Sequence, residues 1–111
     1  LPPVAPAGDR VMQIAFAAGE SRLPGDVQGR LKDLAEQMKT KEALRMQLVA
    51  YAAGGDLSSS AARRLSLSRA LAVRTFLIDN GVRSTRIDVR ALGDKAPDEP
   101  ANRVDVSLSE R

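Results

Sequence analysis

Residues 61–80 constrain the fold more than any other segment of this chain. Their apolar side chains recur at the spacing of one helical face, and Asn80 followed by Gly81 is a typical helix end. A helix with one apolar face is stable only when another element covers that face, so the rest of the chain must provide a packing surface. The residues predicted to face that surface are Ala62, Leu65, Ser66, Ala70, Val73, Phe76 and Leu77.

Strand-like segments can supply this surface. Apolar and polar side chains alternate over residues 11–16, 44–51, 87–91 and 104–108. A second amphipathic helix begins near Pro24, with an apolar stripe that includes Leu31 and Met38. The order is then β-α-β-α-β-β. We predict an α/β fold, an α+β sandwich in which two main helices pack on a mixed four-stranded sheet.

The composition limits the chemistry of the chain. Its 111 residues suit one domain with a single core. The sequence has no cysteine and no histidine, which excludes disulfides, thiolate metal sites and Ser-His or Cys-His nucleophiles. We therefore expect no enzyme activity, no cofactor and no metal ion. No apolar run approaches the roughly 20 residues of a membrane-spanning helix.

The start of the chain differs in composition from the rest. Residues 1–9 are rich in proline and alanine, and we expect them to be the end of a linker. Residues 10–109 then form the folded domain. Any attachment to a membrane is expected only through a region before the linker.

Arginine is concentrated in the second half of the chain. Between positions 63 and 90 only Asp79 and Asp88 oppose the basic residues. Such a surface attracts an acidic polymer or nucleic acid, or is simply a solvated face. The sequence has too few aromatic residues for a base-stacking platform, so we expect no nucleic acid partner. The arginines are Arg63, Arg64, Arg69, Arg74, Arg83, Arg86 and Arg90.

One of these arginines falls on the predicted buried face of the helix. On a helical wheel Arg69 lies near the middle of that face. A guanidinium there is costly unless it is bonded, so two interpretations are open. Arg69 bonds a carboxylate or carbonyl inside the protein, or it faces a pocket that receives an anionic ligand. The planar guanidinium suits the second role, because it binds a carboxylate through two parallel hydrogen bonds.

The opposite side of the same helix carries an apolar strip, formed by Leu67, Leu71 and Ile78. An exposed strip of this kind is a candidate protein contact. The alternatives are isolated surface residues, or a strip covered by a terminal segment.

The motifs of the second half follow one another in a specific order. From residue 65 the chain reads L-S-L-S-R-A-L-A-V, and Gly81 ends the helix. An Arg-Ile strand start, a Gly-Asp turn with a later proline, and R-V-D-V follow. The residues of these later motifs are Arg86, Ile87, Gly93, Asp94, Pro97, Arg103, Val104, Asp105 and Val106. This order resembles the OmpA-like (OmpA/MotB-type) peptidoglycan-binding domain over nearly the whole chain.

The resemblance implies a location, a ligand and a site. Such domains lie in the periplasm of Gram-negative bacteria, attached to the outer or inner membrane, and bind diaminopimelate of the peptidoglycan stem peptide non-covalently. On this analogy Arg69 holds the ligand carboxylate and Arg103 assists. The aspartate that would hold the ligand ammonium corresponds to Gly54, with Asp56 two residues further on as its candidate replacement.

Two functions remain open from the sequence. The first is a non-catalytic cell-envelope module that binds peptidoglycan through Arg69, with Asp56 and Arg103 as helpers. The alternative is an OmpA-like scaffold that has lost peptidoglycan binding and acts in periplasmic protein–protein interaction or assembly. The apolar strip or the arginine-rich surface would then be the contact. The sequence favours no particular oligomeric state.

Overall fold

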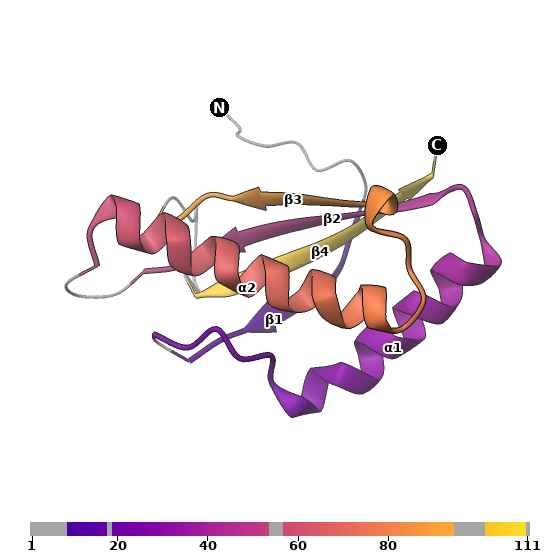
Figure 1. Cartoon of the computed structure of the whole chain (residues 1–111), viewed down its shortest axis with the longest axis horizontal. Coiled ribbons are helices and arrows are strands. Elements are labelled where there is room, and N and C mark those ends of the chain that lie inside the picture. Colours follow the sequence, from indigo (N-terminus) through magenta and orange to yellow (C-terminus); the bar gives the residue numbers. More distant parts are fainter. Residues whose placement is uncertain (1–8, 18, 54–56, 95–101, 111) are drawn as a thin grey trace.

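The computed structural model is a two-layer fold in which two helices cover one face of a four-stranded sheet (Figure 1). The structure describes residues 9–17, 19–53, 57–94 and 102–110. Its elements are β1 (Asp9–Ala15), α1 (Gly25–Thr40), β2 (Leu44–Tyr51), α2 (Ser59–Asp79), the 3-10 helix η1 (Ser84–Arg86), β3 (Ile87–Ala91) and β4 (Arg103–Glu110). The predicted α/β fold, with two main helices and four strands, is confirmed.

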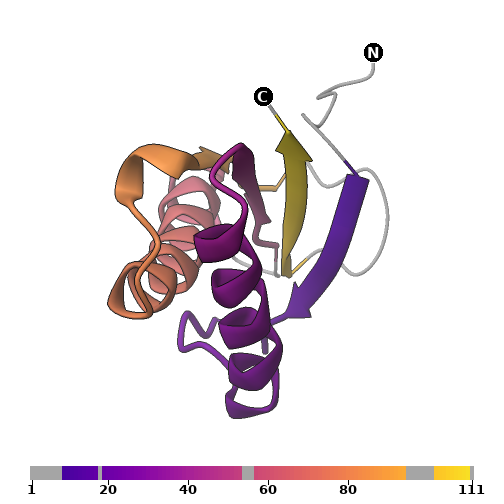
Figure 2. The same cartoon turned by 90° about the vertical axis from the view of Figure 1, so that its right-hand side faces the viewer.

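The sheet is mixed, with the strand order β1-β4-β2-β3. β2 and β3 are parallel, because α2 lies between them in the chain and acts as a crossover. β4 lies inside the sheet because it pairs with β1 on one side and β2 on the other, and it is antiparallel to both. Figure 2 shows both helices on the same side of the sheet. The predicted mixed sheet with helices on one face is therefore observed.

The first two elements begin close to their predicted positions. β1 starts at Asp9, and residues 1–8 of the expected linker lie outside the described residues. Pro24 is the N-cap of α1 rather than its first helical residue, and it makes no side-chain cap hydrogen bond. The start of α1 is stabilised by a hydrogen bond of 3.3 Å from the amide of Val27 to the carbonyl of Pro24 and by the burial of Val27 and Leu31 in its first two turns.

The long helix α2 is capped at both ends. It starts at Ser59, two residues earlier than predicted, because the Ser58 hydroxyl accepts a hydrogen bond of 3.1 Å from the amide of Ala61. Gly81 follows its C-terminal end with a φ of +101°, a left-handed conformation that favours glycine.

The core lies between the sheet and the two helices. α1 buries four residues along one stripe, and α2 buries its predicted face, with Leu65 and Phe76 only partly buried. The strands contribute alternate side chains, as the period of two requires. The buried side chains include Ile14, Leu31, Met38, Met46, Leu48, Val73, Leu77, Val104 and Val106.

Candidate functional site

Arg69 lies on the buried face of α2 and is fully enclosed, with 0% of its surface exposed. Its Nε donates a hydrogen bond of 2.7 Å to the carbonyl of Glu20, and Nη2 donates one of 3.1 Å to the carbonyl of Ala17. Nη1 donates to the carbonyl of Tyr51 at 3.0 Å and to Oδ1 of Asn102 at 2.8 Å. One side chain therefore joins α2 to the end of β2, to the residue before β4 and to the β1–α1 loop.

The charge of Arg69 is balanced by dipoles rather than by an anion. Its acceptors are three main-chain carbonyls and one amide oxygen, and none of the carboxylates in the described residues pairs with it. The Phe16 ring centroid lies 5.2 Å from the guanidinium carbon, within cation-π range. Burial lowers the pKa of the Arg69 guanidinium, because desolvation disfavours its charged form. Of the two interpretations that the sequence leaves open, internal bonding is present in the structure, and it is made by three main-chain carbonyls and one side-chain amide oxygen.

Asn102 connects Arg69 to the loop that follows β2. Its Oδ1 accepts a second hydrogen bond, of 3.0 Å, from the amide of Ala53, and its carbonyl accepts one of 3.0 Å from the amide of Phe16. The sequence predicts no role for Asn102, because an asparagine before a strand is ordinary in a loop. Its one signal is its position directly before the R-V-D-V motif.

Two motif residues fix the loop after β3 against α2. The Ser66 hydroxyl donates to the carbonyl of Arg63 at 2.8 Å and accepts from the amide of Gly93 at 3.1 Å. Gly93 has a φ of +61°, and a Cβ at this position would lie 3.1 Å from the main-chain nitrogen of Arg63. The carbonyl of Gly93 accepts a hydrogen bond of 2.8 Å from the amide of Ala52, at the end of β2. The motif residues therefore position the end of β2 beside Arg69.

Arg103, the predicted helper, lies on the other face of the sheet. Val104 packs into the core below the helices, so the side chain of its neighbour Arg103 points away from them. Arg103 is 2% exposed, its Nε lies 3.1 Å from Oδ1 of Asp105, and its guanidinium carbon lies 4.6 Å from the Tyr51 ring centroid. The structure does not bring the two arginines together around one pocket.

The other two predicted site residues, Gly54 and Asp56, lie outside the described residues. The last described residue before them is Ala53, whose amide bonds the side chain of Asn102. Ala53, which directly precedes them in the chain, thus shares its Asn102 acceptor with Arg69.

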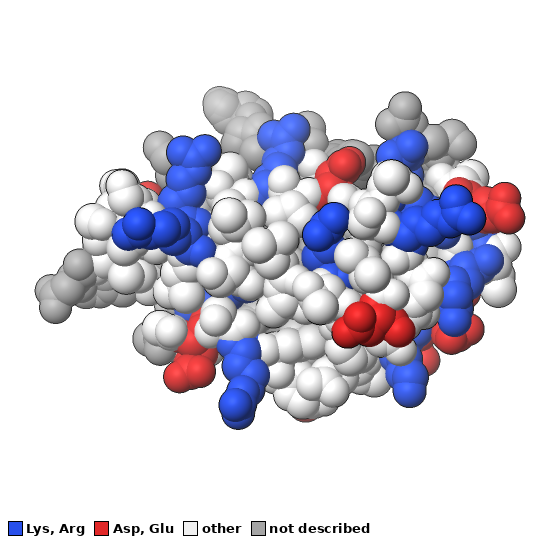
Figure 3. Space-filling model, in the orientation of Figure 1, with Lys and Arg blue, Asp and Glu red and all other residues white. Residues whose placement is uncertain are grey.

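The apolar strip is exposed on α2, with 41% of Leu67, 40% of Leu71 and 36% of Ile78 accessible to solvent. Around it, basic side chains are dispersed over the face shown in Figure 3, with acidic side chains between them. Lysine and arginine side chains thus form no single basic stripe on this face. Among the described residues, no helix is long and apolar enough to span a membrane, and no group of three or more acidic side chains could hold a metal ion.

Two helices on one face of a mixed sheet, held together around a buried arginine, define a class of small α/β domain. The model of the OmpA family matches residues 15–107, and the chain belongs to this family. No curated protein matches the chain.

Solved structures share this fold at low sequence identity. The OmpA-like domain of FopA1 from Francisella tularensis subsp. tularensis SCHU S4 superimposes with a TM-score of 0.76 at 18% identity, over 89% of this chain and 73% of that one. The peptidoglycan-associated lipoprotein from Burkholderia pseudomallei gives a TM-score of 0.76 at 20% identity, over 91% of each chain. The C-terminal domain of Helicobacter pylori MotB gives 0.72 at 18% identity, over 91% and 86%.

Proposed function

We propose that this domain is a non-catalytic module of the bacterial cell envelope that binds the diaminopimelate stem peptide of peptidoglycan in the periplasm. The observation that carries the proposal is Arg69, a buried cation without an anionic partner among the described residues, at the arginine position of the OmpA-like motif. One similar structure is named a peptidoglycan-associated lipoprotein, and another is described as a periplasmic domain of MotB.

Binding at Arg69 requires that a ligand carboxylate replace protein acceptors. The acceptors that can be displaced at least cost are the carbonyls of Ala17 and Glu20, because these loop residues are exposed and their carbonyls can then bond water. A carboxylate forms stronger hydrogen bonds with a guanidinium than a carbonyl does, and Nε with Nη2 presents two parallel donors. A small shift of the β1–α1 loop would therefore open the site.

The ligand ammonium needs a carboxylate partner near the end of β2. We propose Asp56 for this role, because the loop that contains it begins at Ala53, beside the network of Arg69 and Asn102. Gly54, at the family's aspartate position, has no side chain for this contact. Loss of one charge-assisted hydrogen bond weakens binding by about 10- to 150-fold.

The test is co-sedimentation of the domain with purified sacculi of the diaminopimelate type. Asp56→Asn keeps the size of the side chain and removes its charge, and it should release most of the domain from the pellet. Asp88→Asn, an exposed residue of β3, makes the same chemical change away from the site and should sediment like wild type. Failure of the wild-type domain to sediment would contradict the proposal, as would equal sedimentation of both variants with wild type.

A second function is favoured by one observation, the exposure of the apolar strip on α2. In this alternative the domain is a protein-interaction or assembly scaffold that no longer binds peptidoglycan. Leu71→Ser should then abolish an association that is detected by light scattering and is independent of salt. Leu23→Ser, a half-buried leucine outside the strip, is the control for a general loss of apolar surface.

A further inference from the structure

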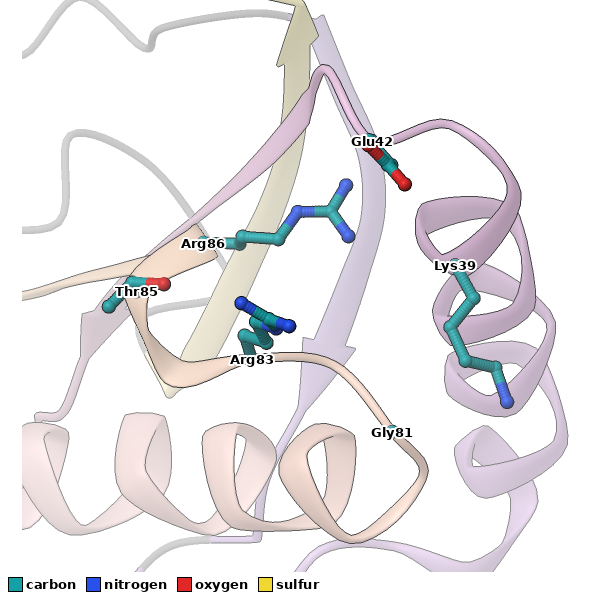
Figure 4. Close-up of a pocket in the computed structure, with 6 residues that line it drawn as sticks. All are labelled: Lys39, Glu42, Gly81, Arg83, Thr85 and Arg86. Atoms are coloured by element: carbon teal, nitrogen blue, oxygen red, sulfur yellow. The ribbon is translucent and has the colours of Figure 1, made fainter.

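A pocket lies at the opposite end of β2 from Arg69. Arg69 bonds the carbonyl of Tyr51, the last residue of β2, whereas Arg86 bonds the carbonyl of Leu44, its first residue. The pocket has a volume of about 410 Å³ and lies between the C-terminal end of α1 and the connection from α2 to β3 (Figure 4). It is lined by Lys39, Glu42, Gly81, Arg83, Thr85 and Arg86.

Arg86 forms the rigid wall of this pocket. Its Nη1 donates to the carbonyl of Met38 at 2.7 Å, Nη2 to that of Lys41 at 2.7 Å, and Nε to that of Leu44 at 3.1 Å. The first two of these carbonyls belong to the C-terminal end of α1, where the partial negative charge of a helix would otherwise repel an anion, and the third belongs to the first residue of β2. Arg86 neutralises the C-terminal end of α1, and these hydrogen bonds hold its side chain in place as the pocket wall.

Arg83 is a second cation of the pocket, and its side chain does not contribute to the packing or hydrogen bonding of the described residues. It is exposed, and its side chain makes no hydrogen bond or ion pair with any residue that the structure describes. Figure 4 shows the guanidinium groups of Arg83 and Arg86 in the same space, with Glu42 at its far side. A charge held at a pocket rim in this way is available to a ligand.

Lys39 adds a third cation, held in place by Gly81. A Cβ at Gly81 would lie 2.9 Å from Cδ of Lys39, so the lysine side chain lies directly against the glycine. Its ion pair with Glu36, at 3.0 Å, is between exposed side chains and contributes little stability. The lining thus contains three cations and the carboxylate of Glu42. Because Glu36 pairs with Lys39, the two arginines outweigh Glu42 by one positive charge.

We propose that this pocket binds a phosphate group. A phosphate group presents two or three unesterified oxygen acceptors to several cations at once, whether it is a dianionic monoester or a monoanionic diester, and arginine and lysine are typical phosphate ligands. The Thr85 hydroxyl in the pocket wall is a further donor. The phosphate belongs either to a soluble compound or to a phospholipid headgroup. This inference does not depend on peptidoglycan binding at Arg69.

The test is a titration of the ¹⁵N-labelled domain with inorganic phosphate, followed by amide chemical shifts at constant ionic strength against chloride. Saturable shifts are expected for Gly81, Arg83 and Thr85. Arg83→Ala should weaken the phosphate affinity about tenfold or more, the effect of losing one charge-assisted hydrogen bond. Because Arg83 is exposed, the variant should fold as wild type.

Two further variants separate a pocket from a general attraction of anions. Arg64→Ala removes the same charge from an exposed position of α2 that lies roughly 25 Å along the helix from Gly81, and it should leave the affinity unchanged. Glu42→Gln removes the opposing carboxylate and should strengthen binding. Shifts that do not saturate, or equal weakening by Arg64→Ala and Arg83→Ala, would overturn the proposal.

Vesicles distinguish the two sources of the phosphate. Co-sedimentation with phosphatidylglycerol vesicles but not with phosphatidylcholine vesicles, lost in Arg83→Ala, would support a lipid headgroup. Binding of inorganic phosphate without binding to either vesicle would support a soluble phosphate compound. Absence of both would contradict the inference.

Discussion

At the residue scale, Arg69 donates hydrogen bonds to four oxygen atoms from three separate segments and so holds these segments together. We predict that Arg69→Met lowers the free energy of unfolding by about 2–4 kcal/mol, because it leaves buried acceptors unsatisfied. The β1–α1 carbonyls can be rehydrated, which keeps the loss within this range. Urea unfolding followed by circular dichroism measures it.

Arg64→Met is the matched control for this change. It replaces an exposed arginine of the same helix, and we expect an effect within about 0.5 kcal/mol. Equal stabilities of the two variants would show that the network around Arg69 contributes nothing to folding.

Two glycines give opposite predictions at the same scale. Gly93→Ala forces a Cβ into a left-handed backbone position, 3.1 Å from the nitrogen of Arg63, and should cost more than about 1 kcal/mol. Gly29→Ala lies in the interior of α1 with no atom within 4 Å of the new Cβ, and should stabilise the domain by about 0.5–1 kcal/mol. Thermal unfolding of the two variants measures these changes in stability. Changes of the same sign in Gly93→Ala and Gly29→Ala would contradict the predictions.

At the scale of elements, Arg86 caps the C-terminal end of α1 by donating hydrogen bonds to the carbonyls of Met38 and Lys41, which lie more than forty residues earlier in the chain. We predict that Arg86→Ala increases amide hydrogen exchange in the last turn of α1 by about tenfold or more, since it removes several hydrogen bonds from one charged group. Exchange at the N-terminal turn of α1 should change less. Arg83→Ala, which removes a neighbouring arginine without these bonds, should leave the exchange as in wild type.

The elements themselves could be predicted from local patterns, whereas their contacts could not. The periodicity of residues 61–80 and the alternation of the strands determine the layer order, because each pattern fixes which face is buried. The acceptors of Arg69 depend on the conformation of the β1–α1 loop, which carries no periodic signal. The side of the sheet on which Arg103 lies could have been predicted from the sequence. Val104 and Val106 point into the core, so Arg103, one residue before Val104, must point to the opposite face.

At the scale of the whole molecule, the two ends of the sheet have different chemistry. One end holds a fully enclosed arginine bonded to neutral oxygens, and the other holds an open pocket with exposed cations. A strand of eight residues, roughly 23 Å long, separates them, so a ligand at one end leaves the other accessible. We therefore expect substitutions at the two ends to change the free energy of unfolding additively.

Peptidoglycan binding as proposed here requires that Arg69 exchange protein carbonyls for a ligand carboxylate. The most direct measurement is the Nε–H resonance of Arg69 in the ¹⁵N-labelled domain during titration with a diaminopimelate-containing stem peptide. We expect a saturable shift of this resonance, together with shifts of the amides of the β1–α1 loop, because the hydrogen bond to the carbonyl of Glu20 is replaced. A peptide that binds elsewhere with the Arg69 resonance unmoved, or that does not bind at all, would contradict it.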